Sequence, residues 1–149
     1  MGQSWVFTKA MDNMNAGNVV PGVNSFKVAL LASLPALTVQ DSANVWGDVS
    51  SLEIAAAGGY TAGGAAVSLS HAVYTTGGVH RSVVAGPANT QWAAASFTAV
   101  AAIVYRSDGA TNYVVALFDF GGSKTSSGGT FQITWDSTNG LYYAGNTPV

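Results

Sequence analysis

Two histidines are the residues best suited to metal or acid–base chemistry in this chain of 149 residues. His71 and His80 fall on two expected strands that flank Gly77-Gly78, a pair of residues that favours a tight hairpin turn. Pairing around that turn places position 71 opposite position 84 and position 80 opposite position 75, so the two histidines do not face each other. Two histidines without a carboxylate between them make a poor metal site. We therefore interpret both as ordinary residues of a sheet surface and expect no bound metal.

Carboxylates are the next candidates, because a pair of them can catalyse hydrolysis. Asp41, Asp48 and Glu53 form the only local acidic group. They fall where a helix and its cap are expected, so we interpret them as capping residues or as part of a solvated face. The sequence around them lacks the oxygen-rich loop of a calcium site. Asp119 lies between two phenylalanines, and we expect it to form a structural ion pair with Arg106 across a hairpin.

Nucleophilic and phosphate-binding chemistry finds no support in the sequence. The serine elbow G-x-S-x-G is absent, and the Gly-Gly pairs lack the spacing of a phosphate-binding loop. We therefore expect no catalytic residue and no cofactor, and we predict that the chain is not an enzyme. A carbohydrate-binding β-sandwich module is an alternative, since tryptophans can stack on sugars, although their spacing suits core positions better. The four tryptophans are Trp5, Trp46, Trp92 and Trp135.

The composition favours a subunit that is covered by partners. Only 8% of the residues are charged, against about 25% in an average soluble domain. Apolar residues make up 48%, and the mean hydropathy is +0.28. A large apolar surface usually marks an interface, so we expect a homo-oligomer or a larger assembly. The net charge of −2 and the five scattered Lys and Arg residues argue against nucleic acid as the partner.

The sequence carries no recognisable targeting or membrane segment. Lys9, Asp12 and Asn13 interrupt the start of the chain, where a secretory signal would need an apolar run. No apolar stretch approaches the roughly 18 residues that read as a membrane helix. Cysteine is absent, so the sequence requires no particular redox compartment. We therefore expect synthesis in a cytoplasm and no membrane partner.

The length predicts a single domain, residues 1–149, and the pattern predicts a mainly β fold. We expect an antiparallel β-sandwich with one or two short helices in the N-terminal third. Residues 1–23 are expected to form an N-terminal arm with a short helix, and Gly17 is its stop. A second helix is expected over Asn44–Leu52. The first helix should bury one apolar face, formed by Phe7, Ala10, Met11 and Met14.

Strands separated by glycine-rich turns account for the rest of the chain. Asp108-Gly109 signals a hairpin between strands at 97–106 and 112–120. The second of these strands is apolar on both faces, so its extra cover is either the N-terminal helix or a neighbouring subunit. Ala55–Ala66 is either a flexible loop or a segment that another backbone approaches closely, with Tyr60 as its anchor. Further strands are expected at 26–33, 67–73, 79–85, 130–135 and 141–144.

Three motifs resemble a widespread group of structural proteins of tailed bacteriophages. They are Phe26-Lys27-Val28-Ala29-Leu30, Trp46-Gly47-Asp48-Val49 and Gly58-Gly59-Tyr60-Thr61-Ala62-Gly63-Gly64, followed by strand segments at 101–106, 115–121 and 129–136. The resemblance covers most of the chain from about residue 24 onward. It implies a non-enzymatic virion subunit, without catalytic residues to carry over.

Among virion roles, the resemblance favours a capsid decoration, or cement, protein with a jelly-roll-like sandwich. It implies the major capsid protein and copies of the chain itself, as a homotrimer, as the partners. The location it implies is the virion, assembled in the cytoplasm of a bacterial host. A tail, fibre or collar component is the alternative within the particle.

Overall fold

The computed structural model describes residues 4–76, 79–85, 89–135 and 142–145. In these residues the chain is mainly β, with two short α-helices and two turns of 3-10 helix. The helical elements are α1 (Thr8–Asn15), α2 (Leu37–Ser42), η1 (Trp46–Asp48) and η2 (Ser50–Leu52). The strands are β1 (Ser4–Val6), β2 (Phe26–Leu31), β3 (Ala65–Val67), β4 (Ser70–Thr76), β5 (Val79–Ala85), β6 (Thr90–Arg106), β7 (Val114–Ile133) and β8 (Tyr142–Gly145).

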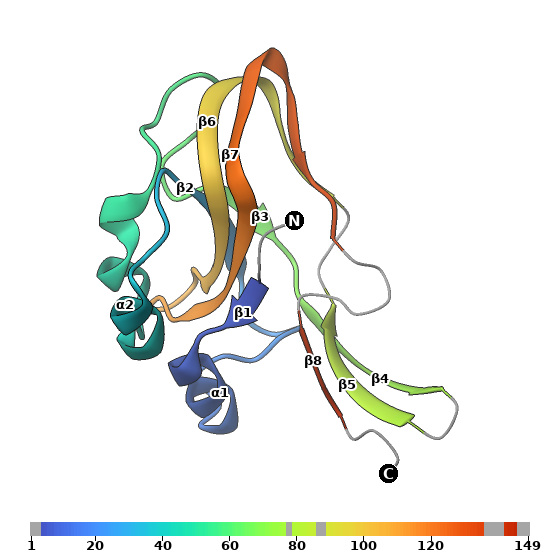
Figure 1. The fold of residues 1–149 in the computed structure, drawn as a ribbon. Coiled ribbons are helices and arrows are strands. Elements are labelled where there is room, and N and C mark those ends of the chain that lie inside the picture. The colour runs from blue at the N-terminus through green and yellow to red at the C-terminus, as the bar shows by residue number, and fades with distance from the viewer. Residues whose placement is uncertain (1–3, 77–78, 86–88, 136–141, 146–149) are drawn as a thin grey trace.

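The strands form two antiparallel sheets, which confirms the expected fold class. The larger sheet has the order β1-β7-β6-β2-β3, and the smaller has the order β4-β5-β8 (Figure 1). The segment expected as an N-terminal arm supplies β1, which pairs with β7 at an edge of the larger sheet, and α1, which packs on that sheet. Two antiparallel sheets are compatible with a sandwich, and the jelly-roll connectivity stays a prediction.

One face of the five-stranded sheet is covered by helical segments. Phe7, which directly precedes α1, and Ala10 of α1 are fully buried against this face, as the helical pattern predicts. Met11 is 40% exposed, so the buried stripe is narrower than expected. The helix therefore supplies the extra cover for β7, and a neighbouring subunit is not needed there. The sheet residues of this cluster are Ala29, Leu31, Ala101, Ile103, Tyr105, Val114 and Leu117.

The opposite face is covered by the chain's own long hairpin of β6 and β7. The outer half of this hairpin bends, and Trp92 packs edge-on against Phe97 and Phe131 there. These rings belong to one apolar cluster with Val28 and Leu30 of β2. The arching hairpin is visible at the top of Figure 1. Both faces of the central strands are thus buried within a single chain.

The glycine pairs of β7 do not end strands, which corrects the sequence-based assignment. Gly121-Gly122 and Gly128-Gly129 lie inside one strand that runs to Ile133. Gly121, Gly122 and Gly128 have positive φ, and the β6–β7 pairing shows several register shifts. Glycines at bulges let a strand bend without ending. The expected separate strand at 130–135 is therefore the end of β7.

The helix expected over Asn44–Leu52 is wrong. The segment forms η1 and η2 instead, and Val49 between them is fully buried. A glycine at position 47 and β-branched valines disfavour a continuous α-helix here. The helix α2 precedes this segment and was not expected. It buries none of its residues, and Leu37 at its start is 77% exposed, so it has no apolar periodicity to detect.

The small-residue segment at 55–66 is a close backbone contact, the second of the two expected alternatives. A side chain at Gly64 would overlap the carbonyl oxygen of Val28, and one at Gly58 would overlap that of Ser96. The backbone amide of Ser96 also donates a hydrogen bond to the Gly58 carbonyl at 2.8 Å. The segment therefore packs against β2 and the bend of β6, where no Cβ atom fits.

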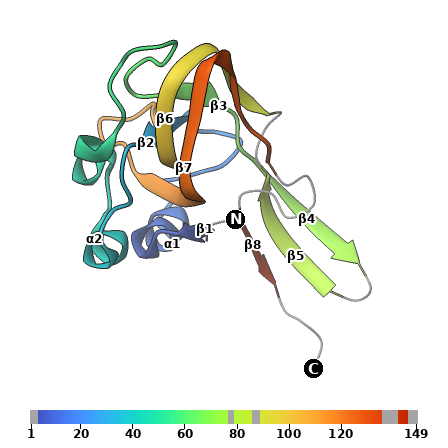
Figure 2. The same ribbon diagram turned by 45° about the horizontal axis from the view of Figure 1, so that its top comes forward.

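The three-stranded sheet projects from the body of the molecule. Figures 1 and 2 show β4, β5 and β8 standing apart from the larger sheet in both views. The β4–β5 pairing places His71 opposite Val84 and Thr75 opposite His80, as the hairpin prediction requires. Gly77-Gly78, on which that prediction depends, and Asn139-Gly140 lie outside the described residues. We call this sheet the β4–β5–β8 arm.

Candidate functional site

The carboxylate of Glu53 lies at the centre of a partly buried hydrogen-bond network. Its Oε1 atom accepts a hydrogen bond from the Tyr60 hydroxyl and another from the Gly63 amide, each at 2.6 Å. The Tyr60 oxygen in turn accepts from the amide of Leu30 at 3.0 Å. Glu53 is therefore neither a helix cap nor part of a solvated face, which corrects its sequence-based interpretation.

Tyr105 adds a second phenol to this network. Its hydroxyl donates to the Gly63 carbonyl at 2.7 Å. Its ring is stacked on Trp46, with centroids 4.6 Å apart and planes 7° from parallel. The network thus joins β6 and the 53–63 segment, with Tyr60 as the anchor that the sequence indicated. The sequence indicated Glu53 as a capping or solvated residue, because spacing alone does not show that Tyr60, seven residues later, folds back onto its carboxylate.

Burial makes the two phenols of the network harder to ionise. Burial, and then the hydrogen bond to Glu53, raise the pKa of Tyr60 far above its ordinary value. Burial raises the pKa of Tyr105 to about 12. Both phenols therefore stay protonated at neutral pH, and both hydroxyls donate structural hydrogen bonds. A general base needs a pKa nearer the working pH, so this cluster is suited to holding the fold.

Asp48 is a capping residue, as predicted. Its Oδ2 atom accepts hydrogen bonds from the amides of Asn44 and Val45 at 2.9 and 3.0 Å. These two bonds lower its pKa below the ordinary value. Asp41 is exposed in α2, consistent with a solvated position. The structure therefore does not bring the three acidic residues of this region together into a catalytic pair.

The expected ion pair between Arg106 and Asp119 is wrong. Arg106 Nε instead donates to Asp108 Oδ1 at 2.6 Å, and Arg106 Nη1 donates to the Asn18 carbonyl at the same distance. Asp119 accepts from the Gly121 amide at 2.8 Å. Asp119 pairs with Ala101, five residues along β6 from Arg106, so the register of the hairpin holds the two side chains apart. The ion pair of Arg106 is therefore a local one, with Asp108 of the adjacent turn.

The histidines give no metal site within the described part of the chain. No group of three His, Cys, Asp or Glu residues gathers there. His71 lies on β4 and is exposed, and His80 lies on β5 opposite Thr75. The two histidines are therefore offset in the arm, as the hairpin pairing predicts. The expectation of no bound metal stays a prediction.

The tryptophans serve mainly as packing residues. Trp92 is 6% exposed, and the other three are only partly accessible. Trp46 is stacked on Tyr105, and Trp135 lies edge-on to Phe118 while its Nε1 donates to Thr90 Oγ1 at 3.1 Å. A sugar platform presents an open ring face. Their packing therefore speaks against the carbohydrate-binding alternative.

Two of the surface hollows formed by described residues contain no His, Asp or Glu. The larger, of about 490 Å³, lies beside the β2–β3 pair and includes Lys27, Ser68 and Ser107. The smaller, of about 350 Å³, lies between Trp46 and Thr111. A hydrolytic site would need an acid, a base or a nucleophile with its base. The larger hollow offers Lys27 and serines but no His or carboxylate to pair with them, and the smaller offers no ionisable side chain.

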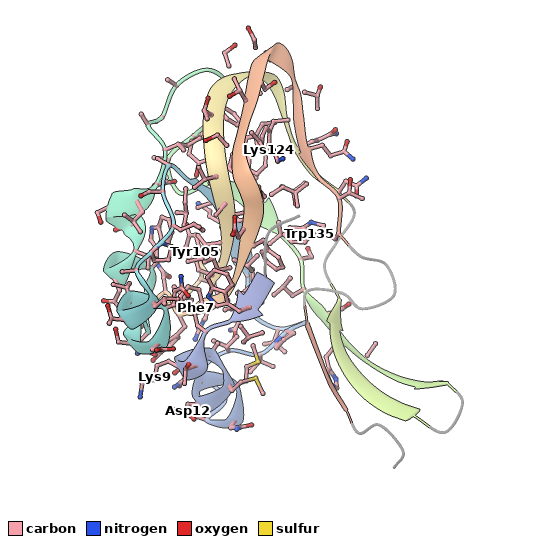
Figure 3. The ribbon with its side chains drawn as sticks, in the orientation of Figure 1. Phe7, Lys9, Asp12, Tyr105, Lys124 and Trp135 are labelled. Carbon is pink, nitrogen blue, oxygen red and sulfur yellow. The ribbon has the colours of Figure 1, made fainter. Side chains whose placement is uncertain are left out.

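Several charged side chains of the described residues lie on the outside of the body. Figure 3 shows Lys9 and Asp12 on the outer side of α1, whereas Phe7 and Tyr105 lie between the helices and the sheet. Lys124 is exposed on the long hairpin. Lys9 and Lys124 lie on different elements, α1 and β7, so these two lysines do not form a basic patch together.

Comparison with known proteins identifies no relative of this chain. Neither the family models, nor the curated proteins, nor the solved structures contain a match to this chain. Among the described residues, no helix has the length and apolar character needed to cross a membrane. Among the described residues, the β4–β5–β8 arm is the most distinctive surface feature.

Proposed function

We propose that this protein is a non-enzymatic structural subunit of a bacteriophage particle, and that it decorates and stabilises the capsid shell. Its partners are then the major capsid protein and further copies of the chain. The observation that carries the proposal is the β4–β5–β8 arm, a projecting sheet whose 18 residues include one charged residue, Arg81. An almost uncharged projecting sheet is suited to burial between subunits.

The use of polar groups in the body supports the same role. Glu53, Asp48, Asp108 and both network tyrosines are engaged in bonds that hold segments of the fold together. These polar groups are therefore occupied by structural bonds and are not available for catalysis.

Copy number in purified particles tests the proposal. A copy number comparable to that of the major capsid protein supports a decoration role. A copy number matching tail proteins assigns the chain to the tail, fibre or collar and rejects decoration. Absence from the particle rejects any virion role.

Heat resistance of the shell gives a second test. Expanded capsids that lack the protein should release their DNA at a higher temperature after the purified chain is added back. The control is the same capsids without added chain. Binding without any gain in heat resistance would contradict a stabilising role.

A further inference from the structure

The strand edges of this molecule are unequally protected against pairing with another chain. β1 and β3, at the two ends of the larger sheet, are three residues long each. Very short edge strands offer little template for pairing. β8, at one end of the arm, is described over four residues.

The outer edge of β7 is protected in a different way. β1 covers this edge only at residues 116–118, so the strand continues beyond its partner. Asp119 and Lys124 place charges along that continuation. Glycines with positive φ and shifts of register bend it. Charges and bulges are the devices by which natural sheets discourage edge-to-edge pairing.

β4 has none of these protections. It is seven residues long, Ser70–Thr76, and is the terminal strand of the arm. It contains no Lys, Arg, Asp, Glu, Pro or Gly, and its pairing with β5 runs without a register shift. Three of its seven residues, Val73, Thr75 and Thr76, are β-branched, a type that favours strands. A long, regular, uncharged edge is a template for an added strand.

We infer that β4 is the self-association surface of this protein, and that the β4 strands of two copies pair antiparallel across a two-fold axis. This deepens the proposed function, on which it rests, by naming the surface through which copies meet. Two identical edges complement each other in backbone hydrogen bonds, and an uncharged strand meets no like-charge repulsion from its own copy.

Full overlap of the two strands fixes the register of this pairing. Val73 is the central residue of β4, so it lies opposite the same residue of the second copy. The arms then join into one six-stranded sheet, twice the three strands of one arm. Antiparallel pairing is the more stable arrangement per residue. The inferred state is a dimer, in place of the trimer that the phage resemblance implies.

The mass of the purified full chain in solution tests this inference. Light scattering or sedimentation equilibrium should give twice the chain mass of 15.1 kDa. A monomer at all accessible concentrations, or a trimer, overturns the two-fold pairing. Either result leaves the particle experiments of the proposed function unaffected, so the two failures are distinguishable.

Charge substitutions at the centre of β4 locate the interface. Val73→Lys places two lysines opposite each other and should raise the dimer Kd by roughly tenfold or more. Val73→Glu should do the same, and an equal mixture of the two variants should restore the dimer. Ser123→Lys adds the same charge on the exposed part of β7 and is the matched control, expected to stay dimeric. Dimers that persist in both β4 variants overturn the inference.

Hydrogen exchange of the unsubstituted chain covers the case in which a β4 variant fails to fold. Amides of residues 70–76 should exchange more slowly at high than at low protein concentration, because pairing protects them. Concentration-dependent protection confined to another segment would assign the interface elsewhere and overturn the inference.

Discussion

The phenol oxygen of Tyr60 lies 2.6 Å from Oε1 of Glu53 and also accepts a hydrogen bond from the amide of Leu30. One side chain thus ties the 53–63 segment to the centre of β2. Tyr60 is 4% exposed, so these bonds exchange poorly with water.

Removing the Tyr60 hydroxyl should destabilise the protein without changing its packing much. Tyr60→Phe leaves the Leu30 amide without its acceptor and Glu53 without one donor, which should cost about 1–3 kcal/mol in free energy of unfolding. Urea denaturation followed by tryptophan fluorescence measures this. Tyr113→Phe, at a partly exposed phenol, is the control and should change stability by less than about 0.5 kcal/mol. Equal losses in both variants would contradict the role of the network.

A methyl group at Gly64 should be far more damaging than one at Gly17. The two glycines have similar φ angles, +77° and +74°. At Gly64 the added Cβ would overlap the Val28 carbonyl oxygen, whereas nothing lies within 4 Å at Gly17. Gly64→Ala should therefore cost about 3 kcal/mol or more, and Gly17→Ala about 1–2 kcal/mol. Thermal unfolding compares them, and similar losses would show that the close approach is absent.

Ala94 offers a stabilising substitution. It has φ of +50°, the only positive value at a non-glycine among the described residues. A Cβ in that region costs about 1–2 kcal/mol, which glycine avoids. The larger entropy of glycine in the unfolded state offsets about 0.5–1 kcal/mol of this gain. Ala94→Gly should therefore raise stability by about 0.5 kcal/mol. Ala93→Gly, in the neighbouring strand position, should lower it, and a loss in both would argue against backbone strain.

Acid should weaken the contact between the hairpin turn at 107–111 and the start of β2. Arg106 and the Ser25 amide, both bonded to Asp108, hold the pKa of that carboxyl below its ordinary value of 3.8. A carboxyl with a lowered folded-state pKa stabilises the fold above its unfolded pKa, and this stability is lost as pH falls through the folded value. Stability of the unsubstituted protein should therefore drop below about pH 4.

The variant Asp108→Asn isolates this effect. It should be less stable near neutral pH and should lose less stability on acidification, in urea unfolding from about pH 6 to about pH 2. Asp12→Asn, on the outer side of α1, controls for the loss of one negative charge. A pH profile for Asp108→Asn that parallels the unsubstituted protein would assign the acid sensitivity to other carboxyls.

Local pattern was sufficient to predict most elements of this fold. The apolar run at 26–33 predicted β2, and the Gly-Gly turn predicted β5 and the pairing of His71 with Val84. The strand expected at 67–73 is instead divided between β3 and β4, which belong to different sheets. The first helix and its stop at Gly17 followed from periodicity. These features depend on residues near each other in the chain, whose side-chain period and turn chemistry are visible in the sequence.

Only the tertiary structure decided how these elements cover one another. Glycines that read as turns became bends inside β7, because β6 supplies a continuous partner along both halves of the strand. Glu53 and Arg106 took partners that spacing does not reveal, since each bond depends on how separate segments meet. The sequence by itself determined a β-rich chain poor in charge. The fold then buried both faces of the large sheet within one chain and left the uncharged edge of β4 on the outside.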